Sequence, residues 1–143
     1  MIEHVIHKQI VIHVNRNNIL VKFQHGFRGK HSCESQLIMT VESIPRYLDR
    51  NKQVDVIVLH FSKAFDTVAH QRLLLKLDHY GIRDKTLGWI RTWLTNRTQR
   101  MVVDDDKSEE SGATSGVPQG TVLGPLMFLL HINDIGDNVS KGT

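Results

Sequence analysis

The segment between residues 112 and 132 constrains the fold more than any other part of this sequence. Four glycines recur at intervals of four through SGATSGVPQGTVLG, and an apolar run, PLMFLLHI, follows them directly. Glycine permits backbone conformations and close approaches that other residues resist, and proline suits the first turn of a helix. The pattern therefore predicts a glycine loop that leads into a helix over about 125–132. A helix with so few polar positions must be covered on several sides, so it belongs in the interior of a domain.

The rest of the pattern predicts a domain of mixed helix and strand, of the α/β or α+β class. Apolar spacing predicts helices over residues 2–13, through the stripe 37–48 with Ser32 or Ser35 as its cap, and over 71–80 and 86–95. Pro45 should kink or split the second of these helices. The β-branched run 54–61 predicts a strand that is covered on both faces, and 99–103 predicts another strand, with the polar run 104–111 as its turn. Two strands make a marginal sheet, so we expect further strands after residue 143.

Composition narrows the class of protein without naming a function. The 143 residues suit one domain, and 18 basic against 15 acidic residues give a net charge of +3, too small to indicate a polyanionic partner alone. One cysteine excludes an internal disulfide, and no apolar run reaches the roughly 18 residues of a membrane helix. We expect an intracellular chain without a membrane segment. The sequence does not distinguish nucleus from cytoplasm, and it leaves the oligomeric state open.

Two loops are candidate binding sites, and each has a plain structural alternative. The glycine loop could bring backbone N–H groups close to a phosphate, or it could simply supply the unusual φ values of a turn before a helix. The basic loop over 24–31, with Phe27 between its charges, could hold a nucleic-acid backbone or be a solvated loop. The nine histidines lack the spacing of a zinc site, and the acidic run over 104–110 lacks the EF-hand pattern.

Taken together, four separated segments resemble one known family. The segments, in order, are QHGFRGKHSCESQL, VDVIVLHFSKAFDTVAHQRLLLKLDHYGI, WIRTWLTNRTQRMVV and SGVPQGTVLGPLMFLLHINDI. Over about residues 1–138 the chain closely resembles the reverse transcriptase domain of non-LTR, LINE-type retrotransposons of the jockey-like branch. The resemblance implies a right-hand polymerase: fingers-like residues over about 1–53, then a partial ferredoxin-like palm with inserted helices over 54–143, truncated before the second catalytic hairpin.

That resemblance also implies an activity, partners and a set of site residues. The activity is RNA-templated DNA synthesis, with an RNA template, a DNA primer, a deoxynucleotide and Mg²⁺. Arg28 would contact a phosphate, and Phe65 would crowd the 2′ position of the incoming sugar. The residues that the resemblance places against template or nucleotide are Gln24, Gly26, Phe27, Arg28, Phe65, Gly116, Pro118, Gln119 and Gly120.

The sequence departs from the family at the metal site. The family reads Asp-Phe-Ser-Lys-Ala-Phe-Asp where this chain reads His-Phe-Ser-Lys-Ala-Phe-Asp, so His60 occupies the position of the metal-binding aspartate. Mg²⁺ prefers oxygen ligands, and a neutral imidazole cannot bridge two cations as a carboxylate can. Asp66 is retained but lies six residues further on. The Tyr/Phe-X-Asp-Asp motif that carries the family's other ligands does not occur before Thr143.

These departures predict a chain without an intact metal site and without polymerase activity. The first interpretation is a fragment of a decayed retrotransposon enzyme. The alternative is a non-catalytic RNA- or DNA-binding protein that keeps the template-contacting loops. The basic residues available for contact with a nucleic-acid backbone are Arg28, Lys30, Lys63, Arg97 and Arg100.

Overall fold

The computed structural model describes residues 2–136, and the chain divides into two compact units. The larger unit joins Met1–Leu20 to Lys63–Thr143, and the smaller unit is Val21–Ser62. The larger unit contains most of the secondary structure and all of the buried apolar cluster. The expected mixture of helix and strand is confirmed, with helix predominating.

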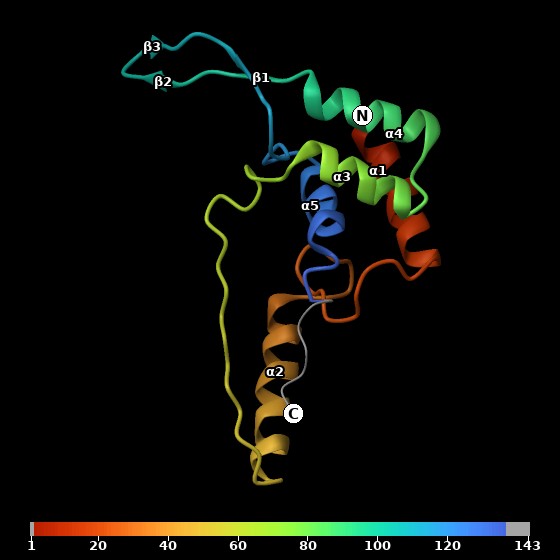
Figure 1. Ribbon diagram of the computed structural model, residues 1–143, viewed down its shortest axis with the longest axis vertical. Helices are drawn as coiled ribbons and strands as arrows, with labels where there is room; N and C mark the ends of the chain where they lie inside the picture. The colour runs from red at the N-terminus through yellow and green to blue at the C-terminus, as the bar shows by residue number, and fades with distance from the viewer. Residues whose placement is uncertain (1, 137–143) are drawn as a thin grey trace. The chain divides into compact units, whose positions relative to one another are not determined.

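Four helices form the body of the larger unit (Figure 1). They are α1 (Ile2–Arg16), α3 (His70–His79), α4 (Asp84–Thr95) and α5 (Gly124–Ile132). Helix α3 lies against both α4 and α5. Each of the four matches a helix that the apolar spacing predicts. No helix among residues 2–136 is long and apolar enough to cross a membrane.

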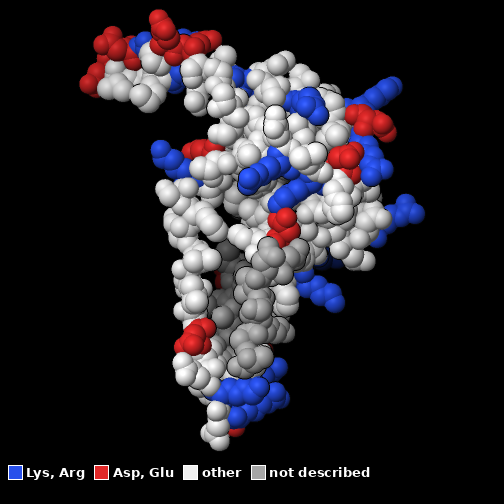
Figure 2. All heavy atoms as spheres, viewed as in Figure 1, with Lys and Arg blue, Asp and Glu red and all other residues white. Residues whose placement is uncertain are grey.

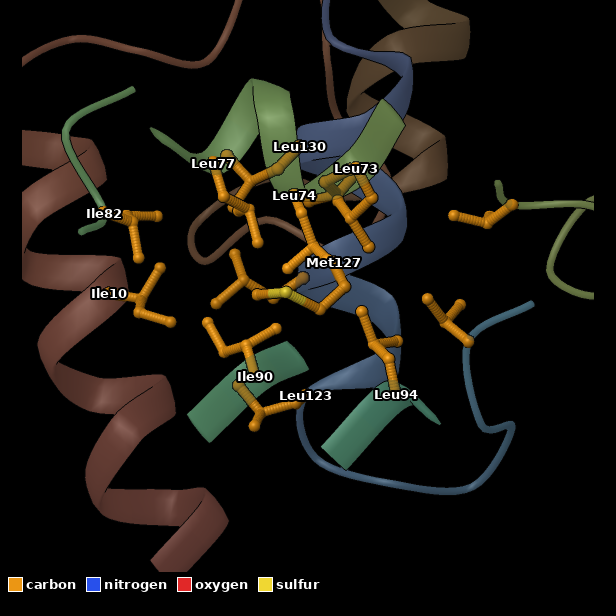
Figure 3. Packing of buried hydrophobic residues seen from close by; sticks show 14 of the residues in the cluster. Ile10, Leu73, Leu74, Leu77, Ile82, Ile90, Leu94, Leu123, Met127 and Leu130 are labelled. Atoms are coloured by element: carbon orange, nitrogen blue, oxygen red, sulfur yellow. The ribbon is translucent and has the colours of Figure 1, made fainter. Parts of the chain in front are cut away.

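Helix α5 lies in the interior, as its apolar sequence predicts. Pro125 stands in its first turn, and Met127, Leu129 and Leu130 are fully buried. Side chains from three other helices surround Met127, and Figure 3 shows Ile10, Leu77 and Ile90 among them. Truncating a core side chain of this size to alanine typically removes about 2–5 kcal/mol of stability. The burial of α5 therefore contributes substantially to the stability of this unit.

The chain turns sharply between α3 and α4. Gly81 has φ +84°, in the left-handed region, and the Ile82 N–H donates to the Leu77 carbonyl at 2.9 Å. Glycine adopts this conformation after a helix at no steric cost, so α3 ends within a residue of the boundary predicted at residue 80. The turn carries Ile82 into the core.

Four two-residue strands form the β structure of the larger unit. β1 (Thr98–Gln99) pairs antiparallel with β4 (Ser111–Gly112), and β2 (Val102–Val103) pairs antiparallel with β3 (Asp106–Lys107). The single strand expected over 99–103 is thus divided, because its two halves have different partners. The turn predicted over 104–111 is confirmed only at its start, because Asp104 and Asp105 join β2 to β3 while residues 106–107 and 111 lie in strands. Figure 2 shows acidic side chains gathered on this solvated hairpin.

The smaller unit contains one helix, α2 (Cys33–Leu48). Ser32 and Ser35 form a capping box at its start, each side chain accepting the other residue's backbone N–H. The predicted interruption at Pro45 does not divide the helix, which continues to Leu48. Near the end of a helix, proline removes only one backbone hydrogen bond, and the Asp49 N–H still reaches the Pro45 carbonyl at 2.8 Å.

The predicted strand over 54–61 is wrong. These residues have no regular secondary structure, and the side chains of Ile57 and Val58 are 83% and 86% exposed. A strand persists only where a neighbouring strand pairs with its N–H and C=O groups. The smaller unit supplies one helix and loops, so its described residues offer no such partner. The β-branched composition favours a strand, but no strand pairs with these residues among those that the structure describes.

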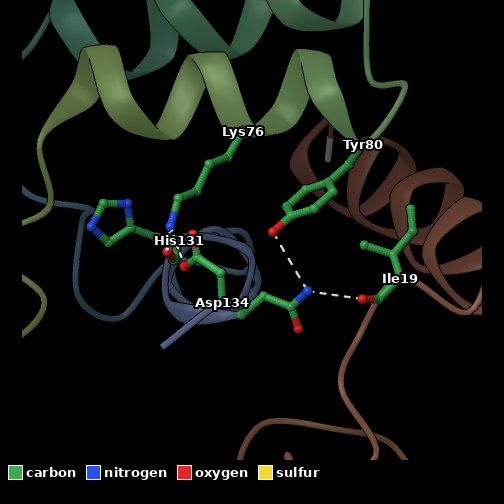
Figure 4. Close-up of polar contacts among 6 residues, drawn as sticks. Ile19, Lys76, Tyr80, His131 and Asp134 are labelled. Atoms are coloured by element: carbon green, nitrogen blue, oxygen red, sulfur yellow. Dashed lines mark hydrogen bonds and ion pairs between the residues drawn. The ribbon is translucent and has the colours of Figure 1, made fainter. Parts of the chain in front are cut away.

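Polar contacts join the end of α5 to α3 and to the segment that follows α1 (Figure 4). The Lys76 ammonium donates to the His131 carbonyl and to the Asp134 carboxylate. The Asn133 amide donates to the Ile19 carbonyl at 2.8 Å. The Lys76 hydrogen bond holds the pKa of Asp134 below its usual range, whereas burial lowers the pKa of His131. The His131 Nδ1 atom is buried without a hydrogen-bond partner among the described residues.

We expect the larger unit to lose stability as the pH falls from 7 to 5. The unfolded chain protonates His131 near its ordinary pKa of 6.5, while the folded chain resists protonation, so the free energy of unfolding declines below that pH. The stabilising contribution of Asp134 is lost only below its ordinary value of 3.8. Urea unfolding followed by tryptophan fluorescence should show the decline.

His131→Gln should flatten that pH dependence, whereas His4→Gln, at an exposed position on α1, should leave it intact. An unchanged slope in His131→Gln would assign the acid sensitivity to another group.

We also expect the exposed apolar run over 56–61 to promote self-association. Contiguous exposed apolar residues with high β propensity pair readily with other chains. The double substitution of Ile57 and Val58 by lysine should raise the soluble, monomeric fraction in analytical ultracentrifugation. A matched control places lysine at the exposed polar positions Ser108 and Thr114. Equal self-association in both variants would contradict this expectation.

Candidate functional site

The residues that the sequence singles out fall in both units. Phe65, Gly116, Pro118, Gln119 and Gly120 belong to the larger unit, where the structure brings their segments together. The others belong to the smaller unit: Gln24, Gly26, Phe27, Arg28 and His60. Each group is therefore a separate local structure.

In the larger unit, the turn over 63–68 is bonded to the glycine loop over 113–120. The Gly116 N–H donates to the Val68 carbonyl at 2.8 Å, and the Val117 N–H donates to the Phe65 carbonyl at 2.9 Å. The Ser115 hydroxyl donates to the Asp66 carbonyl at 2.9 Å. Two segments about 50 positions apart are thus joined backbone to backbone.

Gly116 makes this close approach possible. Its φ is +85°, and a Cβ atom there would lie 2.9 Å from both the Cα and the carbonyl oxygen of Asp66. No L side chain fits that space without moving backbone, and the left-handed φ adds strain for any residue other than glycine. The structural alternative for the glycine loop, a turn with unusual φ values before a helix, is confirmed at Gly116.

The two segments line an open pocket of about 470 Å³, which we call the loop pocket. Its charged lining groups are two cations, Lys63 and Arg97, and one carboxylate, Asp66. Partial burial lowers the pKa of Arg97, but a guanidinium remains charged at neutral pH. The Gln119 and Gln99 side chains add neutral hydrogen-bonding groups. This combination suits an anionic ligand that also carries hydrogen-bond acceptors.

The described residues do not fit a pair of divalent cations. Among residues 2–136, no three His, Cys, Asp or Glu side chains gather where they could hold a metal. Asp66 is the carboxylate that lines the loop pocket, and two cations line it too. His60 is exposed within the smaller unit. The donor set of the loop pocket therefore favours an anion over Mg²⁺.

The basic loop of the smaller unit is held by its own side chains. Arg28 donates from Nη1 to the Val21 carbonyl at 3.1 Å, and Gln24 donates to the Gly26 carbonyl at 3.1 Å. Phe27 has φ +55° and is 65% exposed. Arg28 retains further N–H donors beyond the one used, so its predicted phosphate contact stays a prediction.

The Phe65 ring packs into the larger unit. It stacks on Phe128 of α5, with ring centroids 4.5 Å apart and planes 17° from parallel. This stacking anchors the turn over 63–68 to the interior helix. The contact of Phe65 with a sugar, implied by the resemblance, stays a prediction.

The sequence pattern does not identify the side chains that hydrogen-bond to the glycine loop from α3 and from the segment after α4. His70 donates from Nε2 to the Gly116 carbonyl at 2.8 Å, and Arg97 donates from Nη2 to the same oxygen at 3.0 Å. Gly124 is also tightly packed, because a Cβ atom there would lie 2.3 Å from the Pro118 carbonyl oxygen. These contacts join distant positions, so no local pattern could reveal them. The sequence predicts for Arg97 only a contact with a nucleic-acid backbone.

Gly116→Ala should destabilise the larger unit by about 2–4 kcal/mol, because it combines a backbone clash with a strained φ. Gly112→Ala is the matched control, since a Cβ atom there meets nothing within 4 Å. Thermal unfolding of both variants measures the difference. Equal stability of the two variants would show that the close approach at Gly116 is not required.

Comparison with known proteins identifies the family of this chain. The model of the family described as reverse transcriptase (RNA-dependent DNA polymerase) matches residues 1–143. A probable RNA-directed DNA polymerase from transposon X-element of Drosophila melanogaster is 32% identical over 133 residues, 93% of this chain and 14% of that protein. The RNA-directed DNA polymerase from mobile element jockey, of the same species, is 32% identical over 114 residues, covering 80% of this chain and 12% of that protein.

The match extends beyond these two relatives. A Pol polyprotein from the type-1 retrotransposable element R2 of Popillia japonica is 29% identical over 86 residues, 60% of this chain and 14% of that protein. No solved structure matches. The chain spans about a seventh or less of the length of each of these relatives. It belongs to the reverse transcriptase family, as a segment of the reverse transcriptase domain of jockey-like non-LTR retrotransposons.

Proposed function

We propose that the loop pocket binds the phosphate-bearing backbone of an RNA–DNA substrate, or the incoming nucleotide, and that this chain does not polymerise. One observation carries the binding half of the proposal. The turn over 63–68 and the glycine loop, two segments about 50 positions apart, are bonded together around one pocket with two cationic side chains.

The chemistry of the lining supports an anionic ligand. Lysine offers a compact point charge, and arginine offers a planar fork of donors that matches phosphate oxygens. Lys63 is exposed and free to move toward a ligand, whereas Arg97 is half-buried and fixed by two backbone carbonyls, those of Leu94 and Gly116. Gln119 lies beside them with an exposed amide. The pocket therefore combines one adaptable and one preorganised cation.

The loss of catalysis rests on His60. Phosphoryl transfer by two divalent cations depends on carboxylates that hold both ions, and Mg²⁺ when bound would activate the attacking 3′ oxygen. An imidazole at the position of the family's aspartate supplies neither the charge nor a second bridging atom. The described residues do not gather a replacement set. The same proposal includes the finer architecture, with fingers-like residues over about 1–53 and a partial palm over 54–143.

Binding is tested with a fluorescein-labelled RNA–DNA duplex and fluorescence anisotropy. We expect micromolar affinity that weakens steeply as salt is raised. Lys63→Ala should weaken binding and reduce the salt slope by about one counterion. Lys107→Ala, an exposed lysine on the acidic hairpin, is the control and should change little. Absence of binding by the unmodified chain at low salt would refute the binding half of the proposal.

Catalysis is tested by primer extension on an RNA template with Mg²⁺ or Mn²⁺. We expect no template-dependent incorporation by this chain, with the jockey polymerase as the positive control. Replacing the matching aspartate of the jockey polymerase with histidine should reduce its extension by more than about a hundred-fold. Incorporation by the unmodified chain, or undiminished extension by the jockey variant, would contradict the role assigned to His60.

The two assays also separate the two interpretations of the chain. Duplex binding without extension supports a non-catalytic RNA- or DNA-binding protein. Neither binding nor extension supports a decayed enzyme fragment.

A further inference from the structure

We infer that His70 and Arg97 are positioning residues that fix the glycine loop through a shared acceptor, the Gly116 carbonyl. The inference rests on the proposed function, because it concerns the geometry of the same pocket. Neither the family resemblance nor the charge pattern assigns a positioning role to His70 or Arg97. The two donors come from separate places: His70 is the first residue of α3, and Arg97 follows α4.

The Gly116 carbonyl receives two donors at once. His70 Nε2 lies 2.8 Å from its oxygen and Arg97 Nη2 lies 3.0 Å from it. A carbonyl oxygen has two lone pairs, so both are used. Since a carbonyl can only accept, the His70 ring must carry its proton on Nε2. Gly116 and His70 are buried and Arg97 is half-buried, and away from water such hydrogen bonds are stronger.

The same peptide group is held at its other end. The Val117 N–H donates to the Phe65 carbonyl, and the preceding Gly116 N–H donates to the Val68 carbonyl. The peptide between Gly116 and Val117 therefore cannot rotate without breaking bonds on both sides. Because Pro118 and Gln119 follow immediately, the direction of their backbone is set by this fixed peptide. Gln119 in turn lines the loop pocket.

Substitution of His70 tests the positioning of the loop without removing a ligand contact. Its side chain is 8% exposed and does not line the pocket, so it acts on a ligand only through the loop. Arg97 lines the pocket as well as anchoring the loop, so its substitution would mix both effects. A His70 variant is therefore the informative one. It should change affinity without changing the number of phosphate contacts.

The test compares His70→Leu, which removes the donor, with His70→Gln, whose amide can donate to the same carbonyl. Both are assayed for thermal stability, for hydrogen exchange at the Gly116 and Val117 amides, and for binding of the fluorescein-labelled RNA–DNA duplex over a range of salt. We expect faster exchange at both amides in His70→Leu and about ten-fold weaker duplex binding with an unchanged salt slope. His70→Gln should restore both.

Each result decides the inference. Exchange at wild-type rates in a folded His70→Leu protein would overturn it, whether or not the chain binds the duplex. A reduced salt slope would also overturn it, because His70 would then contact phosphate itself. If the unmodified chain binds no duplex, the proposed function fails, and the exchange rates alone decide the positioning role. If His70→Leu does not fold, His70→Gln is compared instead with His70→Asn, whose shorter amide cannot reach the Gly116 carbonyl. Equal amide exchange in those two variants would overturn the inference.

Discussion

The absence of a side chain at Gly116 is the constraint on which the site of this protein depends. Only without a Cβ atom can the glycine loop approach Asp66 so closely that four hydrogen bonds form between the two segments, one of them from the Gln119 amide to the Asp66 carboxylate. The same residue presents its carbonyl to groups at the start of α3 and just after α4. One backbone position thus joins two loops and the ends of two helices. A change in the geometry of the pocket would therefore disturb the start of α3 and the segment after α4.

The core and the pocket are coupled through α5 as well. Phe65, in the turn over 63–68, stacks on Phe128, and Gly124 at the start of α5 packs against the Pro118 carbonyl. Protein interiors are close-packed, so a shift of α5 by a fraction of an ångström would be transmitted to both walls of the pocket. The buried face of the helix supplies the rigidity that a preorganised cation such as Arg97 needs. Stability and site geometry are therefore parts of one packing arrangement in the larger unit.

Sequence patterns predicted the features of the fold that depend on neighbouring residues alone. The four helices of the larger unit follow from apolar spacing, and Gly81 and Pro125 mark helix ends through their own backbone preferences. The strand over 54–61 failed because a strand needs a partner, and β-branched composition says nothing about whether a partner is present. At the site, the glycines indicated a loop with unusual φ values. His70 gave no signal, since its role depends on a contact with a residue 46 positions away.

His60 and the loop pocket are structurally independent, and this separates binding from catalysis. Every hydrogen bond described for the turn of the pocket begins at Lys63 or later, so replacing a residue at position 60 breaks none of them. The cations that line the pocket, Lys63 and Arg97, likewise belong to the larger unit, whereas residue 60 belongs to the smaller one. A substitution at position 60 therefore leaves the hydrogen bonds and the charged lining of the pocket in place. Decay of catalysis in such a domain therefore does not entail decay of binding.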